Sequence, residues 1–265
     1  MEAMREDKLM DKKALSPYLS NLQMYGFGFL VGLVLLLLGS VFFMLPLVFI
    51  GDMEISNPEE MMDKMYTYQA FAACACEILG ISLSLIFFRK VFIDDFKALK
   101  EDWLKYAIII IIASVLIFAS GYVFEWVYDA LNLNPDSENQ EAIVEALFGK
   151  GKVMMIIQVA IVAPIFEEIV FRKLTYGFLR ETKLHGVLNF ILVAFLFAII
   201  HCTSENFFSY EAYIYLLNYF VLSALLTGSY VLCKDNIYAS ILVHMINNIL
   251  SLLTVYGVIN AIQLF

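Results

Sequence analysis

The stretch VMMIIQVAIVAPIFEEIVFRKLTYGF, residues 153–178, joins a long apolar run to two adjacent carboxylates, Glu167 and Glu168. Arg172 follows four residues after Glu168. An apolar run of this length is typical of a membrane-spanning helix, which needs about 20 predominantly apolar residues. Charged side chains in hydrocarbon are costly, so those that occur inside spans are candidates for function. The stretch therefore predicts a membrane fold and a functional site within it.

The composition of the whole chain agrees with a membrane protein. Of its 265 residues, 62% are hydrophobic and 16% are charged, against about 45–50% and about 25% in soluble domains. The net charge of −9 argues against nucleic-acid binding. The four cysteines lie in or beside apolar runs without a zinc-type CxxC pair, and we interpret them as small apolar residues.

Seven apolar runs along the chain are candidates for membrane spans, and the tail 256–265 either extends the last helix or forms an eighth partial pass. The connections are too short for a separate soluble domain, so we expect an all-α polytopic membrane protein with about 7–8 helices in one bundle. The expected parts are a cytoplasmic N-terminal segment, 1–24, and a single membrane domain, 25–265. The seven runs are 25–50, 67–88, 104–127, 153–171, 187–202, 212–233 and 238–255.

Lys and Arg predict the orientation, because they concentrate in cytoplasmic connections. Only Lys64, Lys150 and Lys152 fall on one side of the predicted spans, where the loops 51–64 and 129–145 are acidic. The N-terminus is therefore predicted to be cytoplasmic. The first run is far longer than a signal-peptide core of about 7–15 residues, so it is expected to remain as a span. The 14 Lys and Arg residues of the other side are Arg5, Lys8, Lys12, Lys13, Arg89, Lys90, Lys97, Lys100, Lys105, Arg172, Lys173, Arg180, Lys183 and Lys234.

Two ionisable residues in the first half of the chain admit ordinary explanations. Glu125 lies near a predicted outer interface, where water solvates it. Glu77 lies inside the second predicted span and is either a structural hydrogen-bonding residue or a gate. Small residues at a spacing of four, such as Gly28 with Gly32 and Ala224 with Gly228, are expected to let helices approach closely.

The two adjacent carboxylates differ in their surroundings. Glu168 and Arg172 are four residues apart on a helix, so their side chains can meet, and the ion pair relieves part of the cost of burial. Glu167 points about 100° away around the helix and has no local counter-charge, which suits it to general acid–base chemistry.

Two further pairs of polar or aromatic residues lie four apart on later spans. Phe197 and His201 share a face of the fifth, and His244 and Asn248 share a face of the seventh. His244 and Asn248 both offer hydrogen-bond donors that can be aimed at one point, as an oxyanion site requires. Each pair alone is more often structural, but the combination on three spans is difficult to assign to packing.

These motifs resemble the CPBP family, also called the ABI or type II CAAX-protease family. The stretch 226–248 also resembles the closing segment of that family, and the resemblance covers about residues 150–255, which we take as the catalytic core. The matching motifs are Glu167-Glu168-x-x-x-Arg172, Phe197-x-x-x-His201 and His244-x-x-x-Asn248.

The resemblance implies an intramembrane glutamate-type endopeptidase. Glu167 and His201 would polarise a water molecule for attack on the scissile carbonyl, and His244 and Asn248 would form the oxyanion hole. No metal or other cofactor is implied. The implied partners are membrane lipid and a substrate that is either a peptide or a lipidated protein with a prenylated CAAX terminus.

The resemblance assigns supporting roles to three further residues. Glu168 and Arg172 would order the helix and the catalytic carboxylate, and Phe197 would pack beside the site. A simple layout of seven spans, however, places Glu167 near the cytoplasmic end of one span and His201 near the outer end of the next. Either the fourth helix runs on to about residue 180, or the segment 172–186 lies partly within the membrane.

Two alternative functions remain open from the sequence. One is a zinc protease with Glu167, His201 and His244 as ligands, since three such ligands and a water form an acceptable catalytic zinc site. The other is a non-proteolytic membrane scaffold or immunity-type regulatory protein. The acidic outer loops and the lack of organelle signals favour a prokaryotic plasma membrane over the endoplasmic reticulum.

Overall fold

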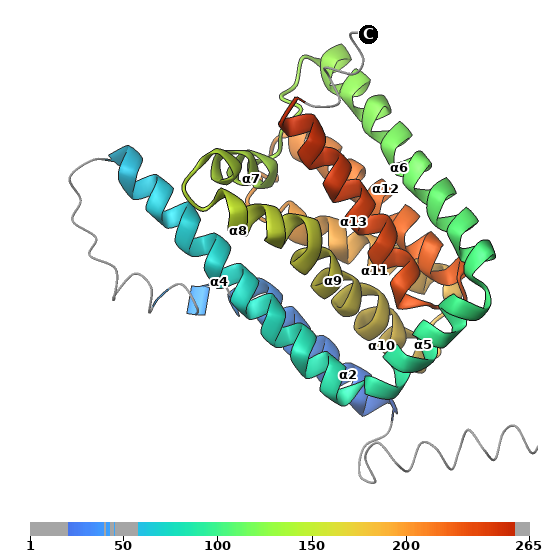
Figure 1. Cartoon of the computed structure of the whole chain (residues 1–265). Coiled ribbons are helices and arrows are strands. Elements are labelled where there is room, and N and C mark those ends of the chain that lie inside the picture. Colours follow the sequence, from blue (N-terminus) through green and yellow to red (C-terminus); the bar gives the residue numbers. More distant parts are fainter. Residues whose placement is uncertain (1–20, 40, 43–44, 46–57, 258–265) are drawn as a thin grey trace, which may run out of the picture.

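The computed structural model describes residues 21–39, 41–42, 45 and 58–257, and helices dominate this part of the chain (Figure 1). The predicted N-terminal segment 1–24 and the tail 256–265 lie mostly outside the described residues. The elements are α2 (Asn21–Val34), η2 (Leu35–Gly39), α4 (Pro58–Phe87), α5 (Arg89–Glu101), α6 (Trp103–Leu131), α7 (Glu138–Phe148), α8 (Lys152–Ile157), η3 (Gln158–Val162), α9 (Ala163–Glu168), η4 (Ile169–Thr175), α10 (Tyr176–Glu181), α11 (Gly186–His201), α12 (Tyr210–Leu232) and α13 (Ile237–Val255).

Six helical segments in the described part of the chain are long and apolar enough to cross a membrane. They correspond to six of the seven predicted spans, and the seventh is α11, an apolar helix of 16 residues that is shorter than the others. The chain is therefore an all-α, multi-pass membrane protein, as predicted, with the expected count only approximate. The six segments are Asn21–Gly39, Lys64–Phe87, Trp103–Leu131, Lys152–Glu181, Tyr210–Leu232 and Ile237–Val255.

The fourth predicted span extends ten residues beyond its expected end at residue 171. The segments α8, η3, α9, η4 and α10 follow one another without a break from Lys152 to Glu181. These 30 residues are about 45 Å long at the rise of an α-helix, and Glu167 lies near their midpoint. The first of the two expected explanations for the depth of Glu167 is therefore the one that the structure adopts.

Two short helices lie at opposite ends of the bundle (Figure 1). The helix α7 begins at Ser137, whose side chain accepts a hydrogen bond from the backbone N–H of Gln140, an N-terminal cap of the usual kind. Its last turn is held by Tyr256, which donates to the carbonyl of Leu147 at 3.0 Å. The helix α5 lies at the other end of the bundle, between α4 and α6.

Ion pairs join α5 and the start of α6 to the neighbouring segments. Lys173 in η4 reaches Asp95 in α5 at 2.7 Å, with both side chains mostly buried. Lys234, after α12, reaches Asp102 at 2.7 Å near the surface. The α5 end also carries most of the Lys and Arg residues in the described part of the chain.

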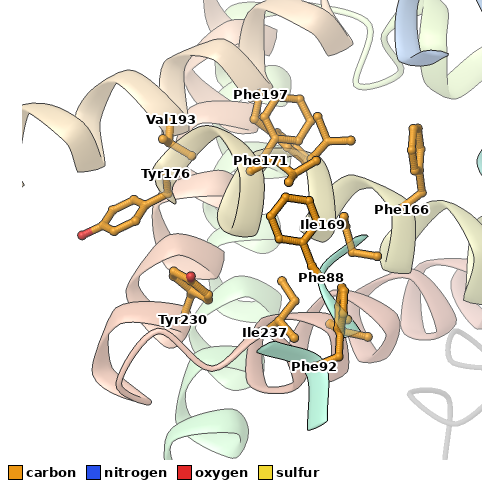
Figure 2. Close-up of a cluster of buried hydrophobic side chains, with 13 residues drawn as sticks. Phe88, Phe92, Phe166, Ile169, Phe171, Tyr176, Val193, Phe197, Tyr230 and Ile237 are labelled. Atoms are coloured by element: carbon orange, nitrogen blue, oxygen red, sulfur yellow. The ribbon is translucent and has the colours of Figure 1, made fainter. Parts of the chain in front are cut away.

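An apolar core fills the α5 end of the bundle. Buried aromatic and aliphatic side chains from α5, α9, η4, α10, α11, α12 and α13, with Phe88 just before α5, pack there against one another (Figure 2). Gly28 and Gly32 of α2 lie against Leu174 and Val170, so their expected role in close packing is confirmed. That expectation was wrong for Gly228, because a Cβ atom there would meet no atom within 4 Å.

Candidate active site

The three ionisable residues of the predicted catalytic set converge from three helices. The Oε2 atom of Glu167 in α9 lies 3.7 Å from Nε2 of His201, at the end of α11, and 3.8 Å from Nε2 of His244 in α13. Both distances exceed that of a direct hydrogen bond and suit a bridging water molecule. The convergence therefore brings one carboxylate opposite two imidazole nitrogens.

Hydrogen bonds fix which nitrogen of each imidazole ring faces Glu167. Nδ1 of His201 lies 2.9 Å from the backbone carbonyl of Phe197. Because a carbonyl only accepts, Nδ1 carries the proton, and Nε2 of the neutral ring presents its lone pair toward Glu167. Nδ1 of His244 lies 2.9 Å from Oε1 of Glu168, which makes it a donor to that carboxylate in the same way.

Glu168 and Arg172 form the predicted ion pair beneath the site. Their side chains are completely buried, and Nη1 of Arg172 donates to Oε1 of Glu168 at 2.8 Å. Nη2 of Arg172 donates to both the hydroxyl and the backbone carbonyl of Ser223 in α12. Since Glu168 also accepts from His244, the pair connects three helices and holds one imidazole in place.

Phe197 packs between the two imidazole rings and the guanidinium, as predicted. It is fully buried, and its ring stacks on that of His201 with the centroids 4.1 Å apart. The centre of the Arg172 guanidinium lies 4.9 Å from the same ring, in the range of a cation–π contact. The opposite side of His201 faces Tyr219, whose ring centroid is 5.0 Å away.

Asn248 lies on the face of α13 that carries His244. Its Nδ2 donates to the backbone carbonyl of Val159 in η3 at 2.8 Å, and its Oδ1 accepts from Asn247 at 3.1 Å. The amide nitrogen carries a second hydrogen, which is available for another acceptor. Asn248 is thus anchored to the helix that carries Glu167.

A cavity of about 280 Å³ joins these groups. Glu167, His201, His244 and Asn248 line it, together with Phe197 and with polar residues from α6, α7 and α12. Of the predicted residues, Glu168 and Arg172 are not among those that line the cavity. No group of three or more His, Cys, Asp or Glu side chains placed to hold a metal ion is found in the described residues.

The sequence interpretation missed two residues of the site on α12. Tyr219 stacks on His201 and hydrogen-bonds to Ser137, with the two oxygens 3.0 Å apart, and Ser223 holds Arg172. They lie four residues apart, on one face of a largely apolar span, and that spacing was the available signal. Glu77, for which two roles were open, bonds to Gln158 at 2.9 Å, as a structural hydrogen-bonding residue does.

Comparison with known proteins supports the predicted class of protein. The family described as "Type II CAAX prenyl endopeptidase Rce1-like" matches residues 149–250, which include every motif named above. The matched region covers less than half of the chain, and it supports the CAAX-protease, or CPBP, family that the motifs predicted.

A curated protein is distantly similar to this chain. It is the Bacillus subtilis (strain 168) protein named "Putative membrane peptidase YdiL", with 26% identity over 156 residues, which are 58% of this chain and 61% of the relative. The match thus spans about three fifths of that relative's length. No solved structure matches the chain.

Proposed function

We propose that the protein is an intramembrane endopeptidase in which Glu167 and His201 activate a water molecule. The observation that carries the proposal is the position of Glu167, 3.7 and 3.8 Å from the Nε2 atoms of His201 and His244. A water molecule between these groups can pass a proton to the carboxylate while its oxygen attacks a carbonyl carbon, which is general base catalysis.

The attack converts the scissile carbonyl oxygen into an oxyanion, which needs donors. Asn248 offers an amide N–H, and His244, whose Nδ1 contacts Glu168, offers Nε2–H when both ring nitrogens carry a proton. Cleavage of the C–N bond then returns the proton from Glu167 to the leaving nitrogen. The products are a new carboxyl terminus and a new amine, and no metal takes part.

Glu168 and Arg172 act as positioning residues in this proposal. They lie beneath the reacting groups, hold Nδ1 of His244 and connect α9 to α12. Phe197 keeps the His201 ring in one plane by stacking on it. Water attack then starts from a preorganised site.

The substrate class follows from the family and from the membrane location. The family description names prenyl endopeptidases of the CAAX type, and the site lies near the middle of a 30-residue helix. We propose a peptide bond of a small membrane or signal peptide, or of a prenylated CAAX protein, as substrate, with membrane lipid around the protein. We place it in a prokaryotic plasma membrane with a cytoplasmic N-terminus.

The decisive experiment compares Glu167→Gln with Glu77→Gln in a peptide-cleavage assay on purified protein, using prenylated and unprenylated peptides. Glu77 is a matched control, because it is a mostly buried glutamate within a span that is not among the residues lining the cavity. We expect Glu167→Gln to reduce kcat by about 10²–10⁴-fold, the usual contribution of a general base, and Glu77→Gln to retain most activity.

Two outcomes would replace this function with another. Inhibition by a chelator that added zinc reverses would identify the Glu167, His201 and His244 set as a zinc site. Full biological activity of both Glu167→Ala and His201→Ala would identify a non-proteolytic scaffold. We expect neither, with chelators leaving the cleavage rate unchanged.

A further inference from the structure

We propose that the substrate reaches Glu167 from the acidic end of the bundle, which is the non-cytoplasmic side of the membrane. The proposal rests on the peptidase function proposed above and specifies its substrate: a peptide segment exposed on that side. Three independent features of the structure support it.

The first feature is the origin of the residues that line the cavity. They include Ser137 before α7, Gln140 and Leu147 of α7 itself, and Gly121 in the second half of α6. Further members come from the first half of α12 and from the part of α13 after His244. Among the described residues, none of the lining side chains belongs to α5, η4 or α10. The cavity therefore extends from Glu167 toward α7 and away from α5.

The second feature is the packing on the other side of Glu167. Glu168 and Arg172 are completely buried there, and Phe166 and Ile169 are each only 1% exposed. Phe166 and Ile169 belong to the core of apolar side chains that extends to the α5 end (Figure 2). A peptide coming from that end would have to displace a buried ion pair and this core, whereas the α7 end already holds a cavity.

The third feature is the distribution of Lys and Arg at the two ends. The α5 end carries ten such residues from Arg89 to Lys234, whereas the α7 end carries Lys64, Lys150 and Lys152 in the described part of the chain. Glu205, in the connection after α11, accepts from the backbone N–H of Glu138 in α7, which places that connection at the α7 end. Because Lys and Arg concentrate in cytoplasmic connections, the α7 end is the outer one.

The charge at the cavity entrance adds a preference within this class. Seven acidic residues lie at the α7 end, toward which the cavity extends, and a field of one sign raises the local concentration of oppositely charged ligands. Peptides with Lys or Arg near the scissile bond should therefore be cleaved faster than peptides with Glu. These acidic residues are Asp129, Asp136, Glu138, Glu141, Glu145, Glu205 and Glu211.

The test uses a membrane-impermeant fluorogenic peptide with right-side-out and inside-out vesicles that carry the full chain. We expect right-side-out vesicles to cleave it at least tenfold faster, with detergent making the two rates equal, and a lysine-containing peptide to be preferred to its glutamate counterpart at low salt. Faster cleavage by inside-out vesicles would overturn the proposed entry side, and the absence of a charge preference would overturn the role of the acidic entrance. If detergent-solubilised protein shows no cleavage that depends on Glu167, the peptidase function itself fails.

Cysteine labelling gives a readout that does not depend on the choice of peptide. All four native cysteines are buried, so single added thiols can be followed. In right-side-out vesicles, an impermeant maleimide should label Gln140→Cys at the cavity entrance, and labelling should lower the activity of that variant at least fivefold relative to the same variant unlabelled. The matched variant Lys97→Cys, on α5, should react only in inside-out vesicles. The reverse pattern of labelling would overturn the proposal.

Discussion

The two ends of the bundle differ in how their polar side chains are placed. At the α5 end, polar groups are buried in fixed pairs, such as Glu168 with Arg172 and Lys173 with Asp95. At the α7 end, polar groups line a cavity of about 280 Å³. Glu167 lies at the boundary, with its backbone in the packed half and its carboxylate in the cavity.

This difference suggests that buried polar groups at the α5 end support the structure, whereas those that line the cavity are available for chemistry. A carboxylate that lines a polar cavity can exchange protons with a molecule bound there. A carboxylate in a buried ion pair is instead fixed by its partner. Adjacent glutamates, one turning to each half, therefore give the site both a reactive group and a support. Substitutions should accordingly affect stability in the packed half and activity in the cavity half.

The largest effect on stability is expected from Arg172→Met. It leaves the carboxylate of Glu168 buried without its cationic partner, and breaking a buried pair in this way costs about 3–5 kcal/mol. We expect a fall of that size in the free energy of unfolding, measured by reversible unfolding in mixed micelles. The double variant Glu168→Leu with Arg172→Met should recover part of the loss, and equal stability of the single and double variants would contradict the role of the pair.

A smaller effect is expected from Gly80→Ala in α4. The added Cβ atom would overlap a ring carbon of the buried Phe166. Such overpacking lowers the free energy of unfolding by about 1–3 kcal/mol. The control is Gly228→Ala in α12, where a Cβ atom meets nothing within 4 Å. Thermal unfolding of the two variants should differ, and a Gly80→Ala protein as stable as Gly228→Ala would show that α4 and α9 are less tightly packed.

A modest effect is expected from Tyr219→Phe on the cavity side. The variant keeps the ring against His201 but loses the hydrogen bond to Ser137, which is worth about 0.5–1.5 kcal/mol. The exposed Tyr213 of the same helix supplies the control, Tyr213→Phe. Unfolding in micelles should separate the two variants, and identical stabilities would mean that the hydroxyl of Tyr219 does not hold the start of α7.

The smallest effect is expected from Lys234→Ala. The side chains of Lys234 and Asp102 are 65% and 40% exposed, and such surface pairs contribute little. We expect no measurable change in the unfolding temperature. Lys173→Ala, which removes the mostly buried partner of Asp95, should lower that temperature clearly, so equal behaviour of the two lysine variants would contradict the contrast between buried and exposed pairs.

The sequence was sufficient to predict the fold class and the contacts that depend on helical spacing. The pair of Glu168 with Arg172 and the stacking of Phe197 on His201 are both i,i+4 contacts, and both are present. The family match supports the same motifs. Most contacts of the candidate site could therefore be predicted from helical spacing in the sequence.

Long-range packing limited the prediction elsewhere. The fourth span was ended too early because Arg172 and Lys173 suggested a membrane boundary, yet partners from other helices make both residues compatible with burial. Tyr219 and the cavity depend on how α12 and α7 meet, which no local pattern specifies. The packing expected at Gly228 failed for the same reason.

The two wide turns of the central helix have a consequence for its register. Each π-helical segment, η3 and η4, accommodates about one residue more per turn than an α-helix. Removing one residue from η3 would rotate the preceding part of the helix by about 100° relative to Glu167. Gln158 would then leave Glu77, and the carbonyl of Val159 would leave Asn248. The wide turn thus acts as a spacer that lets one helix face α4 at one level and His201 and His244 at the next.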